Sequence, residues 1–415
     1  MRKEGPGLAF YLSKTNRYSV TALVAAVEYY HPETSITFFY DLEELGKLDP
    51  EEYVLAFSFS SFDLNRAYPL ILHARARGFT IVAGGPHPSA RPHELLEKGV
   101  KHVVIGDGER AILKFLHGEC ALILREPVYD LENFPPFAIN HGMYMPIEIT
   151  RGCPFRCAYC QVPNIFGRKV RHRSVENVLH WIKEGIKRGK KLVRFISPNA
   201  FGYASSDGIH PNVDAIARLL EGARKLGVEQ LYFGSFPSDV RPESVTPDVL
   251  GLVKKFCDNK SIIVGAQSGS IRVLKKIKRG HDVETVERAV AMIRESGLTP
   301  HVDMIFGFPF ETDEDVEANI RFMERLIKSY SARIHAHTFM PLPGSEFENM
   351  PPGKLGKRYL KVLGYYAARG SLDGMWYKQE QLARYLDNLK REGEYENKGR
   401  SCAGTFRSLQ NQEKS

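Results

Sequence analysis

The sequence is poor in cysteine and contains no long hydrophobic run. Six cysteines in 415 residues are too few for a disulfide-stapled scaffold. No apolar run approaches the roughly 18 residues that a transmembrane helix needs. Near the N-terminus the apolar stretch Leu8 to Leu12 is too short for a signal peptide and no small-residue cleavage site follows it. These absences predict a cytoplasmic protein with no membrane span.

Net charge is modest, but the basic excess is unevenly distributed. The chain has 57 Lys and Arg against 49 Asp and Glu, a net charge of +8. Residues 351–415 hold 13 of the basic and 7 of the acidic residues, so this segment alone supplies +6. A basic surface favours anionic partners, nucleic acid among them. A solvated, charge-rich surface without such a partner is the alternative interpretation.

Residues 1–125 alternate short apolar runs with helical patterns. Strands separated by helices of about ten residues are typical of βαβ units in a parallel sheet covered on both faces. The pattern predicts an α/β domain of Rossmann-like (flavodoxin-like) type, which binds ligands at the carboxyl ends of its strands. The predicted strands are Leu8–Leu12, Ile36–Tyr40, Val54–Phe59, Thr80–Ala83 and His102–Ile105, and the predicted helices include Val20–Tyr30, Arg66–Arg77 and Arg91–Glu97.

Two glycine-containing loops follow the fourth and fifth predicted strands. Glycine lets a backbone approach a ligand closely and adopts positive φ angles without strain. Both loops therefore belong to the edge of the sheet where a ligand is expected. They read Gly84-Gly85-Pro86-His87 and Gly106-Asp107-Gly108-Glu109.

The rest of the chain divides into three parts. Residues 126–145 are irregular and contain several prolines, which predicts an interdomain linker. Residues 146–345 contain six longer β/α units, which predict a partial (β/α)6 barrel with its active site at the carboxyl ends of the strands. Residues 346–415 are expected to form a small helical extension. The predicted barrel strands are Ile147–Thr150, Leu192–Ile196, Gln230–Gly234, Ser261–Ala266, His301–Phe306 and Arg333–Phe339.

Three of the six cysteines lie within eight residues, directly after the first predicted barrel strand. Cys153, Cys157 and Cys160 have the spacing Cys-x3-Cys-x2-Cys. Three thiolates from one loop can bind three irons of a [4Fe–4S] cluster and leave the fourth iron open for a small chelating ligand. A structural zinc site would need a fourth protein ligand, and no second Cys-x2-Cys pair is present. The remaining cysteines, Cys120, Cys257 and Cys402, stand alone.

This segment resembles the radical S-adenosylmethionine (SAM) enzymes, and the resemblance covers roughly residues 145–345. The cysteine spacing and the aromatic residue before the third cysteine carry it. It implies that SAM chelates the fourth iron. It also implies that one electron, from an external reductant of ferredoxin or flavodoxin type, cleaves SAM to a 5′-deoxyadenosyl radical. Later stretches also match the family: Gly265-Ala266-Gln267-Ser268-Gly269-Ser270, Leu274 to Gly280, and Asp303-Met304-Ile305-Phe306-Gly307-Phe308-Pro309.

The same resemblance implies residues that contact SAM. Gln267 and Ser268 are expected at the cofactor, and Tyr159 is expected to offer its backbone beside the adenine. Ser197-Pro198-Asn199 stands where the family has Gly-Gly-Glu, a departure that affects the contact to the amino group of SAM. Arg241, after the third barrel strand, is expected to pair with the SAM carboxylate.

A parallel α/β domain ahead of such a barrel resembles the cobalamin-dependent subfamily. The resemblance implies cobalamin contacts from Gly84, Gly85, Pro86, His87, Gly106, Asp107, Gly108 and Glu109, with Ser60 near the nucleotide tail. The Asp-x-His-x-x-Gly motif, which supplies a lower axial histidine in some cobalamin proteins, is absent. Cobalt is therefore expected to have no histidine ligand from this domain.

These resemblances predict a cobalamin-dependent radical SAM enzyme, most simply a methyltransferase acting at an unactivated carbon. Cyclases and other rearrangement enzymes of the subfamily share the same parts and stay open. A methylthiotransferase is less favoured because residues 1–145 contain only Cys120, whereas three further cysteines are expected there for a second cluster. A dinucleotide-binding interpretation of Gly106 to Ala111 is disfavoured because the motif follows the fifth strand rather than the first.

Two further groups of residues are candidates for substrate contacts. His335 and His337 are two apart on a predicted strand, so both face the same side. The basic run Arg168 to Arg173 follows the cysteine loop and would suit an anionic substrate, RNA included. Structural histidines and a solvated surface are the respective alternatives. The sequence identifies neither the substrate nor a catalytic residue.

Overall fold

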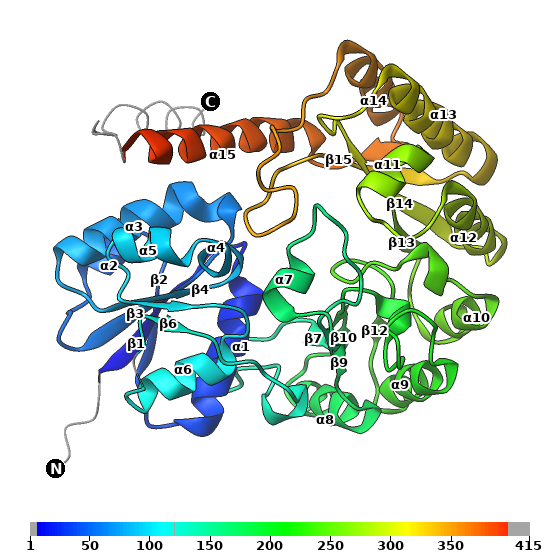
Figure 1. The fold of residues 1–415 in the computed structure, drawn as a ribbon. Coiled ribbons are helices and arrows are strands. Elements are labelled where there is room, and N and C mark those ends of the chain that lie inside the picture. Colours follow the sequence, from blue (N-terminus) through cyan, green and yellow to red (C-terminus); the bar gives the residue numbers. More distant parts are fainter. Residues whose placement is uncertain (1–5, 120, 397–415) are drawn as a thin grey trace.

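The N-terminal domain is a six-stranded parallel sheet with helices on both faces (Figure 1). The computed structural model describes residues 6–119 and 121–396. The strand order β2-β1-β3-β4-β5-β6 is that of a flavodoxin-like domain, which confirms the predicted fold class. The strands are β1 (Gly7–Tyr11), β2 (Ile36–Phe39), β3 (Tyr53–Ser58), β4 (Ile81–Gly84), β5 (His102–Val104) and β6 (Ile123–Leu124).

The central strands are buried on both faces, which is why they appear in the sequence as continuous apolar runs. All five residues of β1 are buried, and they alternate between two hydrophobic clusters. Tyr11 packs in one cluster with the helix after β3, and Phe10 packs in the other with the helix after β1. The helices are α1 (Arg17–Tyr30), α2 (Leu42–Gly46), α3 (Leu64–Ala76), α4 (Pro86–Ala90), α5 (Pro92–Glu97) and α6 (Glu109–Leu116).

Several short elements of this domain differ from the prediction. The elements β6, α2 and α4 are not predicted from the sequence, because elements of two to five residues carry too little periodicity to be recognised. The loop after β4 is only partly a loop: Pro86 begins α4, where its fixed φ suits the first helical turn. Glu109, expected in the next loop, is likewise the first residue of α6.

Residues 126–145 are not a loose linker but a packed segment between the two domains. Val128, Leu131 and Phe134 are buried in a small cluster with Ala26 of α1. Phe137 is buried in the core of the second domain. The segment therefore contributes apolar side chains to both sides of the domain boundary.

The second domain is the predicted partial barrel, built from short parallel pairs and one longer sheet. Its longest strands form a parallel four-stranded sheet in the order β13-β14-β15-β16. The first predicted strand is split, and its second half pairs antiparallel with a short strand that follows the cysteine loop. The strands are β7 (Ile147–Glu148), β8 (Thr150–Arg151), β9 (Arg171–His172), β10 (Leu192–Val193), β11 (Phe195–Ile196), β12 (Gln230–Leu231), β13 (Ser261–Gln267), β14 (Thr299–Phe306), β15 (Arg333–Thr338) and β16 (Leu372–Asp373).

Polar N-cap residues fix where the long barrel helices begin. At each of these caps a side-chain oxygen accepts the backbone N–H three residues later, which satisfies a group the helix leaves unpaired. Thr312 and Asp315 form a reciprocal capping box at the longest of them. The helices are α7 (Val162–Phe166), α8 (Val175–Ile186), α9 (Val213–Lys225), α10 (Pro247–Phe256), α11 (Ile271–Lys276), α12 (Val283–Glu295), α13 (Asp313–Tyr330), α14 (Lys357–Ala368) and α15 (Trp376–Glu396).

The C-terminal extension is more than a helical appendage. It adds β16 to the edge of the barrel sheet, where Leu372 and Asp373 pair with β15. Helix α15 then lies against the N-terminal domain (Figure 1), and Leu386 is buried in the core of that domain. The extension therefore ties the two domains together. Residues 397–415 and Cys402, and the isolated Cys120, lie outside the described residues.

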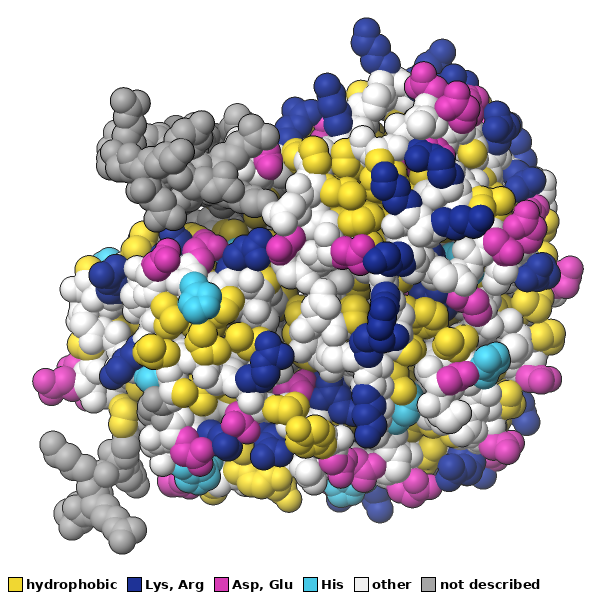
Figure 2. All heavy atoms as spheres, in the orientation of Figure 1, with side chains coloured by type: hydrophobic (Ala, Val, Ile, Leu, Met, Phe, Trp, Pro, Cys, Tyr) yellow, Lys and Arg dark blue, Asp and Glu magenta, His cyan; other side chains and the backbone are white. Residues whose placement is uncertain are grey.

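Surface charge is mixed on the face seen in Figure 2, where Lys and Arg side chains are interspersed with Asp and Glu. Among the described residues, no helix combines the length and apolarity needed to cross a bilayer.

Candidate active site

The cysteine loop lies between β8 and α7 and is held by backbone contacts on several sides. The N–H of Cys153 donates to the carbonyl of Gly167 at 3.1 Å, and the N–H of Ala158 donates to the carbonyl of Ile277 at 3.0 Å. Gly152 has a φ of +84°, and a Cβ there would lie 2.4 Å from the Lys169 carbonyl oxygen. Only glycine fits this turn.

The three cysteines are free thiols with different electrostatic surroundings. Burial raises the pKa of Cys153, and it raises the pKa of Cys160 to about 11. Burial acts in the same direction at Cys157, but two nearby guanidinium groups outweigh it and lower the pKa of that thiol. The loop therefore already stabilises one thiolate before any metal is considered.

Those guanidinium groups belong to Arg279 and Arg241. Their Nη1 atoms lie 3.5 Å and 3.8 Å from the Cys157 Sγ atom, respectively. Arg279 also donates from Nη2 to the Gly265 carbonyl at 2.7 Å, and Arg241 donates from Nη2 to Glu243 at 2.6 Å. The Nε groups of both arginines are buried and have no hydrogen-bond partner among the described residues.

A buried, unpaired guanidinium N–H is costly. Both belong to the arginine pair whose other nitrogens contact the Cys157 Sγ atom. Arg241, expected to contact the SAM carboxylate, is thus at the cysteine loop. Sequence reasoning quoted Arg279 within a family stretch but did not single it out as a site residue.

Gln267 ends β13 in an unusual backbone conformation beside the arginine pair. Its φ is +74°, and the pairing of β13 with β14 is irregular between Gly265 and Gln267. A Cβ on Gly265 would lie 2.7 Å from Arg279 Nη2 and 2.8 Å from Gln267 Nε2. Strained non-glycine residues are concentrated at functional sites, and this one brings the predicted SAM contact next to Arg279.

Ser268 and Tyr159 are placed differently from one another. The Ser268 hydroxyl is fully buried, donates to Asn319 Oδ1 at 2.7 Å and accepts the N–H of Ser270. That pairing anchors the end of β13 to α13. Tyr159 is half-buried in the cysteine loop, and burial raises the pKa of its hydroxyl.

Pro198 and Asn199 border the cysteine loop. They line a small pocket together with Cys153 and Phe155. The Asn199 side chain accepts the backbone N–H of Arg241 at 3.1 Å and donates to Ser244 Oγ at 2.7 Å. Asn199 therefore lines the pocket and also holds the loop that carries Arg241 in place.

Asp107 and Glu109, predicted in a cofactor loop, form a buried ion cluster with the barrel. Arg151 donates to Asp107 at 2.9 Å, to Glu109 at 2.6 Å and to Glu148 at 2.6 Å. Arg171 pairs with the other oxygen of Asp107 at 2.7 Å. Burial would raise the pKa of Glu109, but the Arg151 charge more than reverses this and lowers it.

The expectation that Arg168 to Arg173 presents four cations to a substrate is wrong for two of them. Arg171 forms an ion pair with Asp107, and Arg173 is buried with its Nη2 donating to the Phe134 carbonyl at 2.9 Å. Arg171 is directed toward the Asp107 carboxylate, and Arg173 donates to the backbone carbonyls of Glu148 and Phe134. Only Arg168 and Lys169 of the basic residues in this run are exposed.

The loop after β4 packs against the end of β3. Gly85 has a φ of +95°, and a Cβ there would lie 2.8 Å from the Phe59 backbone nitrogen. His87 is buried, with its Nδ1 2.9 Å from Ser61 Oγ and its Nε2 3.0 Å from the Tyr68 hydroxyl. Both ring nitrogens are thus engaged within the domain. Gly84 and Pro86 flank these contacts at the carboxyl edge.

The loop after β5 faces the barrel. Gly106 has a φ of +84°, and a Cβ there would lie 3.0 Å from the Ile165 carbonyl oxygen in α7. Gly108 is tight against Leu23 of α1. The edge of the N-terminal sheet therefore lies directly against the helix that follows the cysteine loop.

Hydroxyl-bearing residues gather where the strand order of the N-terminal sheet reverses, between β1 and β3. Ser60 donates to Asp63 at 3.1 Å, and Thr15 donates to the other oxygen of the same carboxylate at 2.5 Å. Such switch points are the usual ligand-binding crevices of open α/β sheets.

The inner face of the β13–β16 sheet carries ionisable residues that sequence reasoning largely missed. Asp303 is buried on β14, and its carboxyl shares a hydrogen bond with Asp239, with burial raising the pKa of both. His301 precedes it by two residues, and His335 lies opposite Asp303 on β15. Period-two polar residues in these strands were the available signal, which was recognised only for His335 and His337.

Comparison with known proteins identifies the barrel. Residues 147–323 match the Radical SAM superfamily model. The matched segment is the predicted barrel, and radical SAM domains use a [4Fe–4S] cluster and SAM, so the match agrees with the cofactors predicted for this segment. The chain as a whole combines this domain with a parallel α/β domain in front of it.

Two curated relatives illustrate the range of similar sequences. Uncharacterized protein MK0932 of Methanopyrus kandleri is 24% identical over 384 residues, covering 77% of this chain and 72% of the relative. A tRNA-2-methylthio-N(6)-dimethylallyladenosine synthase of Thermotoga petrophila is 30% identical over 286 residues, covering 65% of this chain. This chain spans 60% of the length of that synthase.

Two solved structures share the fold of both domains. The cobalamin-dependent SAM radical enzyme OxsB with aqua-cobalamin bound has a TM-score of 0.63 at 18% identity, covering 78% of this chain and 52% of OxsB. The radical SAM methyltransferase TsrM from Kitasatospora setae, with cobalamin and a [4Fe–4S] cluster bound, has a TM-score of 0.62 at 15% identity. That match covers 88% of this chain and 78% of TsrM.

Proposed function

We propose that this protein is a cobalamin-dependent radical SAM enzyme that transfers a methyl group from methylcobalamin to an unactivated carbon. The observation that carries the proposal is the arrangement of the two domains. The carboxyl edge of a flavodoxin-like sheet, at Gly106, lies against α7, the helix that follows the cysteine loop. A cofactor bound at the carboxyl edge of the N-terminal sheet would therefore lie near the cysteine loop of the barrel.

The residues of the cysteine loop suit a [4Fe–4S] cluster and SAM. Cys153, Cys157 and Cys160 supply three thiolates, and the unpaired Nε groups of Arg241 and Arg279 await an anionic partner. When bound, the cluster delivers the electron that cleaves SAM, and cobalamin carries the methyl group. The protein holds the carboxylate of SAM through Arg241 and stabilises the Cys157 thiolate through both arginines.

Further SAM contacts are proposed from residues that lie beside the arginines or line the pocket next to the cysteine loop. Gln267 is well placed because it lies beside Arg279, and the backbone of Tyr159 lies within the cysteine loop. Pro198 and Asn199 line the pocket next to Cys153. The hydroxyl of Ser268 acts through Asn319, so its contribution is to position β13 rather than to bind the cofactor.

The cobalamin part of the proposal rests on the β1–β3 switch point. Thr15, Ser60 and Asp63 provide polar groups there, as a nucleotide tail requires. His87 is not available as a lower axial ligand, since Ser61 and Tyr68 engage both of its nitrogens. The loops Gly84–His87 and Gly106–Glu109 lie at the carboxyl edge of the sheet. In the second loop, Asp107 and Glu109 form ion pairs with Arg151 at the domain boundary.

Anaerobic reconstitution with iron, sulfide and hydroxocobalamin tests both cofactors. We expect about four irons and one corrin per chain, measured by metal analysis and the ultraviolet–visible spectrum. Replacing Cys153, Cys157 and Cys160 together by alanine should abolish iron binding and SAM cleavage. A triple variant that retains its iron contradicts the cluster assignment.

The cobalamin site needs a variant that leaves the fold intact. A side chain at Gly85 would collide with the Phe59 backbone, so loss of cobalamin there would be ambiguous. Thr15→Leu at the β1–β3 switch point should weaken corrin retention at least tenfold in equilibrium dialysis without changing the iron content. Thr34→Leu, before β2 at the opposite edge of the sheet, is the matched control. Equal retention by all three proteins contradicts the site.

Methylthio transfer to RNA is the second candidate, because a tRNA-modifying methylthiotransferase is among the curated relatives. Residues 1–145 offer only Cys120, so a second three-cysteine cluster is not expected. Product mass separates the two functions: methyl transfer adds one methylene, and methylthio transfer adds a methylene and a sulfur. About eight irons per chain would favour the second candidate.

A cyclase or rearrangement reaction of the same subfamily would consume SAM and form deoxyadenosine without adding any mass to the product.

Nucleic acid is tested as a partner by titrating labelled RNA at low and moderate salt. Binding that weakens steeply with salt supports a polyanion, because counterions are released on binding.

A further inference from the structure

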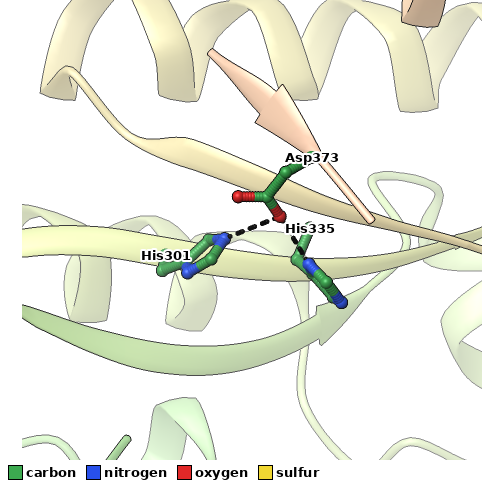
Figure 3. A group of neighbouring side chains, drawn as sticks. All are labelled: His301, His335 and Asp373. Carbon is green, nitrogen blue, oxygen red and sulfur yellow. Dashed lines mark hydrogen bonds and ion pairs between the residues drawn. The ribbon is translucent and has the colours of Figure 1, made fainter. Parts of the chain in front are cut away.

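Two imidazoles and one carboxylate converge on the inner face of the barrel sheet, away from the cysteine loop. His301 comes from β14, His335 from β15 and Asp373 from β16 (Figure 3). His335 and Asp373 are paired across neighbouring strands, and His301 lies one inward-facing position earlier than Asp303. The strand register therefore fixes all three on one face.

Both imidazole rings point at the same carboxylate oxygen. His335 Nδ1 lies 2.5 Å from Asp373 Oδ1, and His301 Nε2 lies 3.2 Å from it (Figure 3). One candidate ligand atom from each residue can be chosen so that all three lie within 4.8 Å of one another. A metal bonded at about 2.0–2.2 Å separates its ligand atoms by roughly 3–3.5 Å, so only small movements are needed to admit one.

The neighbours of this trio resemble the outer contacts of a metal site. Arg333 Nη2 donates to the second oxygen of Asp373 at 3.0 Å, which orients the carboxylate and leaves Oδ1 to the two rings. The ring of His337 lies 4.6 Å from that of His335, and Gln379 Nε2 is 3.0 Å from His337 Nδ1. The three residues are each only partly exposed.

We propose that His301, His335 and Asp373 form a binding site for a divalent transition-metal ion, separate from the iron–sulfur cluster. Two imidazole nitrogens and one carboxylate oxygen are the donor set that zinc, ferrous iron and manganese accept, with positions left open for water or a substrate atom. The inner face carries the open positions, so the ion can hold an oxygen or nitrogen of a substrate inside the barrel. This site does not depend on the proposed methyl transfer.

The site lies away from the part of the sheet that contacts Arg279 beside the cysteine loop, with His335 two strands from Gly265. His301 and His335 are each the third residue of their strands, near the amino ends, whereas the cysteine loop follows the carboxyl end of β8. Asp303 lies in the register row between Gly265, which contacts Arg279, and His335.

Zinc is the probe, applied to the reconstituted protein with its cluster in place. The protein is dialysed against micromolar Zn²⁺ under anaerobic conditions, and bound zinc is counted by mass spectrometry. Its ligands are identified by X-ray absorption at the zinc edge. We expect one zinc per chain with nitrogen and oxygen neighbours only, and with iron content unchanged.

Variants separate metal binding from a simple hydrogen-bond network. His301→Gln and His335→Gln keep a donor toward Asp373 but are poor ligands, and each should reduce zinc affinity at least tenfold. His210→Gln is the matched control, because His210 pairs with Asp207 at 2.5 Å on the exposed surface without a second histidine. It should leave zinc binding unchanged.

Three results overturn the proposal. The first is zinc binding that is absent at micromolar concentration in a protein with full iron content. The second is an X-ray absorption spectrum dominated by sulfur at about 2.3 Å, which places zinc on the cysteines instead. The third is equal affinity in the parent, both barrel variants and the control. Unchanged melting temperatures and iron content ensure that each variant is folded.

Discussion

Arg151 is the residue whose replacement most directly tests the domain boundary. It is buried between Asp107, Glu109 and Glu148, and it immediately precedes Gly152 in the cysteine loop. Arg151→Met keeps most of the side-chain volume and removes the charge. The three carboxylates then keep the charge of Arg171, which contacts only Asp107, and the charge of Arg173, which acts on Glu148 and Glu109 without an ion pair.

The cost follows from charge burial. Removing one partner of a buried ion pair typically costs about 3–5 kcal/mol, because the other charge is left without compensation. For a unit of this size that corresponds to a fall in melting temperature of about 6–20 °C. The pKa of Glu109 is held low in the folded protein by Arg151, against burial. The stabilisation is therefore present above the ordinary carboxyl pKa and is lost as pH falls through the depressed value.

Thermal unfolding of the reconstituted protein at about pH 8 and about pH 5 measures this effect. Glu109 is ionised at both pH values in the parent, but without Arg151 burial shifts the pKa of Glu109 upward, so the carboxyl is neutralised by a proton more readily at pH 5 than at pH 8. We therefore expect the loss in Arg151→Met to be larger at the higher pH, and Glu109→Gln introduced into that variant to restore part of it. Lys187→Met is the matched control, because Lys187 forms an exposed ion pair with Glu184 at 2.5 Å. Such a surface pair contributes about 0–1 kcal/mol. Equal losses in the two single variants would refute the reasoning.

Three further outcomes are expected. Glu311→Gln should flatten the pH dependence of stability. Burial, the largest cause, raises the pKa of Glu311 to about 7, so between about pH 4.5 and 7 the folded state keeps a proton that the unfolded state loses, and stability falls as pH rises. An unfolding free energy from urea denaturation that depends on pH equally in the variant and the parent contradicts this. Arg279→Gln removes a cation 3.5 Å from Cys157 and should lower the reduction potential of the cluster in an electron-paramagnetic-resonance titration; an unshifted potential contradicts it. Gly265→Ala places a Cβ 2.7 Å from Arg279 and should weaken SAM binding in equilibrium dialysis with iron unchanged; equal SAM affinity would count against the assigned site.

The sequence predicted the long elements well because their hydrophobic patterns are strong. All five predicted N-terminal strands are present within two residues at each end, and the partial barrel is confirmed. In the structure, Thr312 and Ser174 cap helix starts through contacts to a residue only three positions later. These features are local, so a single stretch of sequence is sufficient to specify them.

Contacts between distant segments could not be predicted. Asp107 and Glu109 follow a strand end and carry negative charge, a pattern that suits a cofactor loop equally well as an ion cluster. Only the fold shows that Arg151, more than 40 residues later, reaches both. The contacts of Arg171 and Arg173 could not be predicted either. Their charges suggest a substrate surface in the sequence, but in the structure both side chains bind groups at the domain boundary.

The barrel interior shows the opposite limitation. The sequence places Asp303 and His335 on strands, but it does not predict that they lie near Asp239, His301 or Asp373. Each lies on a different strand or loop, and the register that aligns them is set by β-sheet pairing rather than by spacing in the chain. Alternation along one strand predicts a face, but it does not say which residues of the next strand oppose it.

The position of Arg151 connects these observations to the proposed chemistry. Its guanidinium binds the N-terminal sheet through Asp107 and Glu109, while its backbone continues directly into Gly152 and Cys153. A change in the angle between the domains must therefore move the cysteine loop or break a buried ion pair. Breaking the pair costs several kcal/mol, so the edge of the sheet and the cysteine loop are held at a fixed separation. The methyl transfer proposed above would require that fixed separation, since a substrate would have to meet a carrier bound at one and a radical formed at the other in turn.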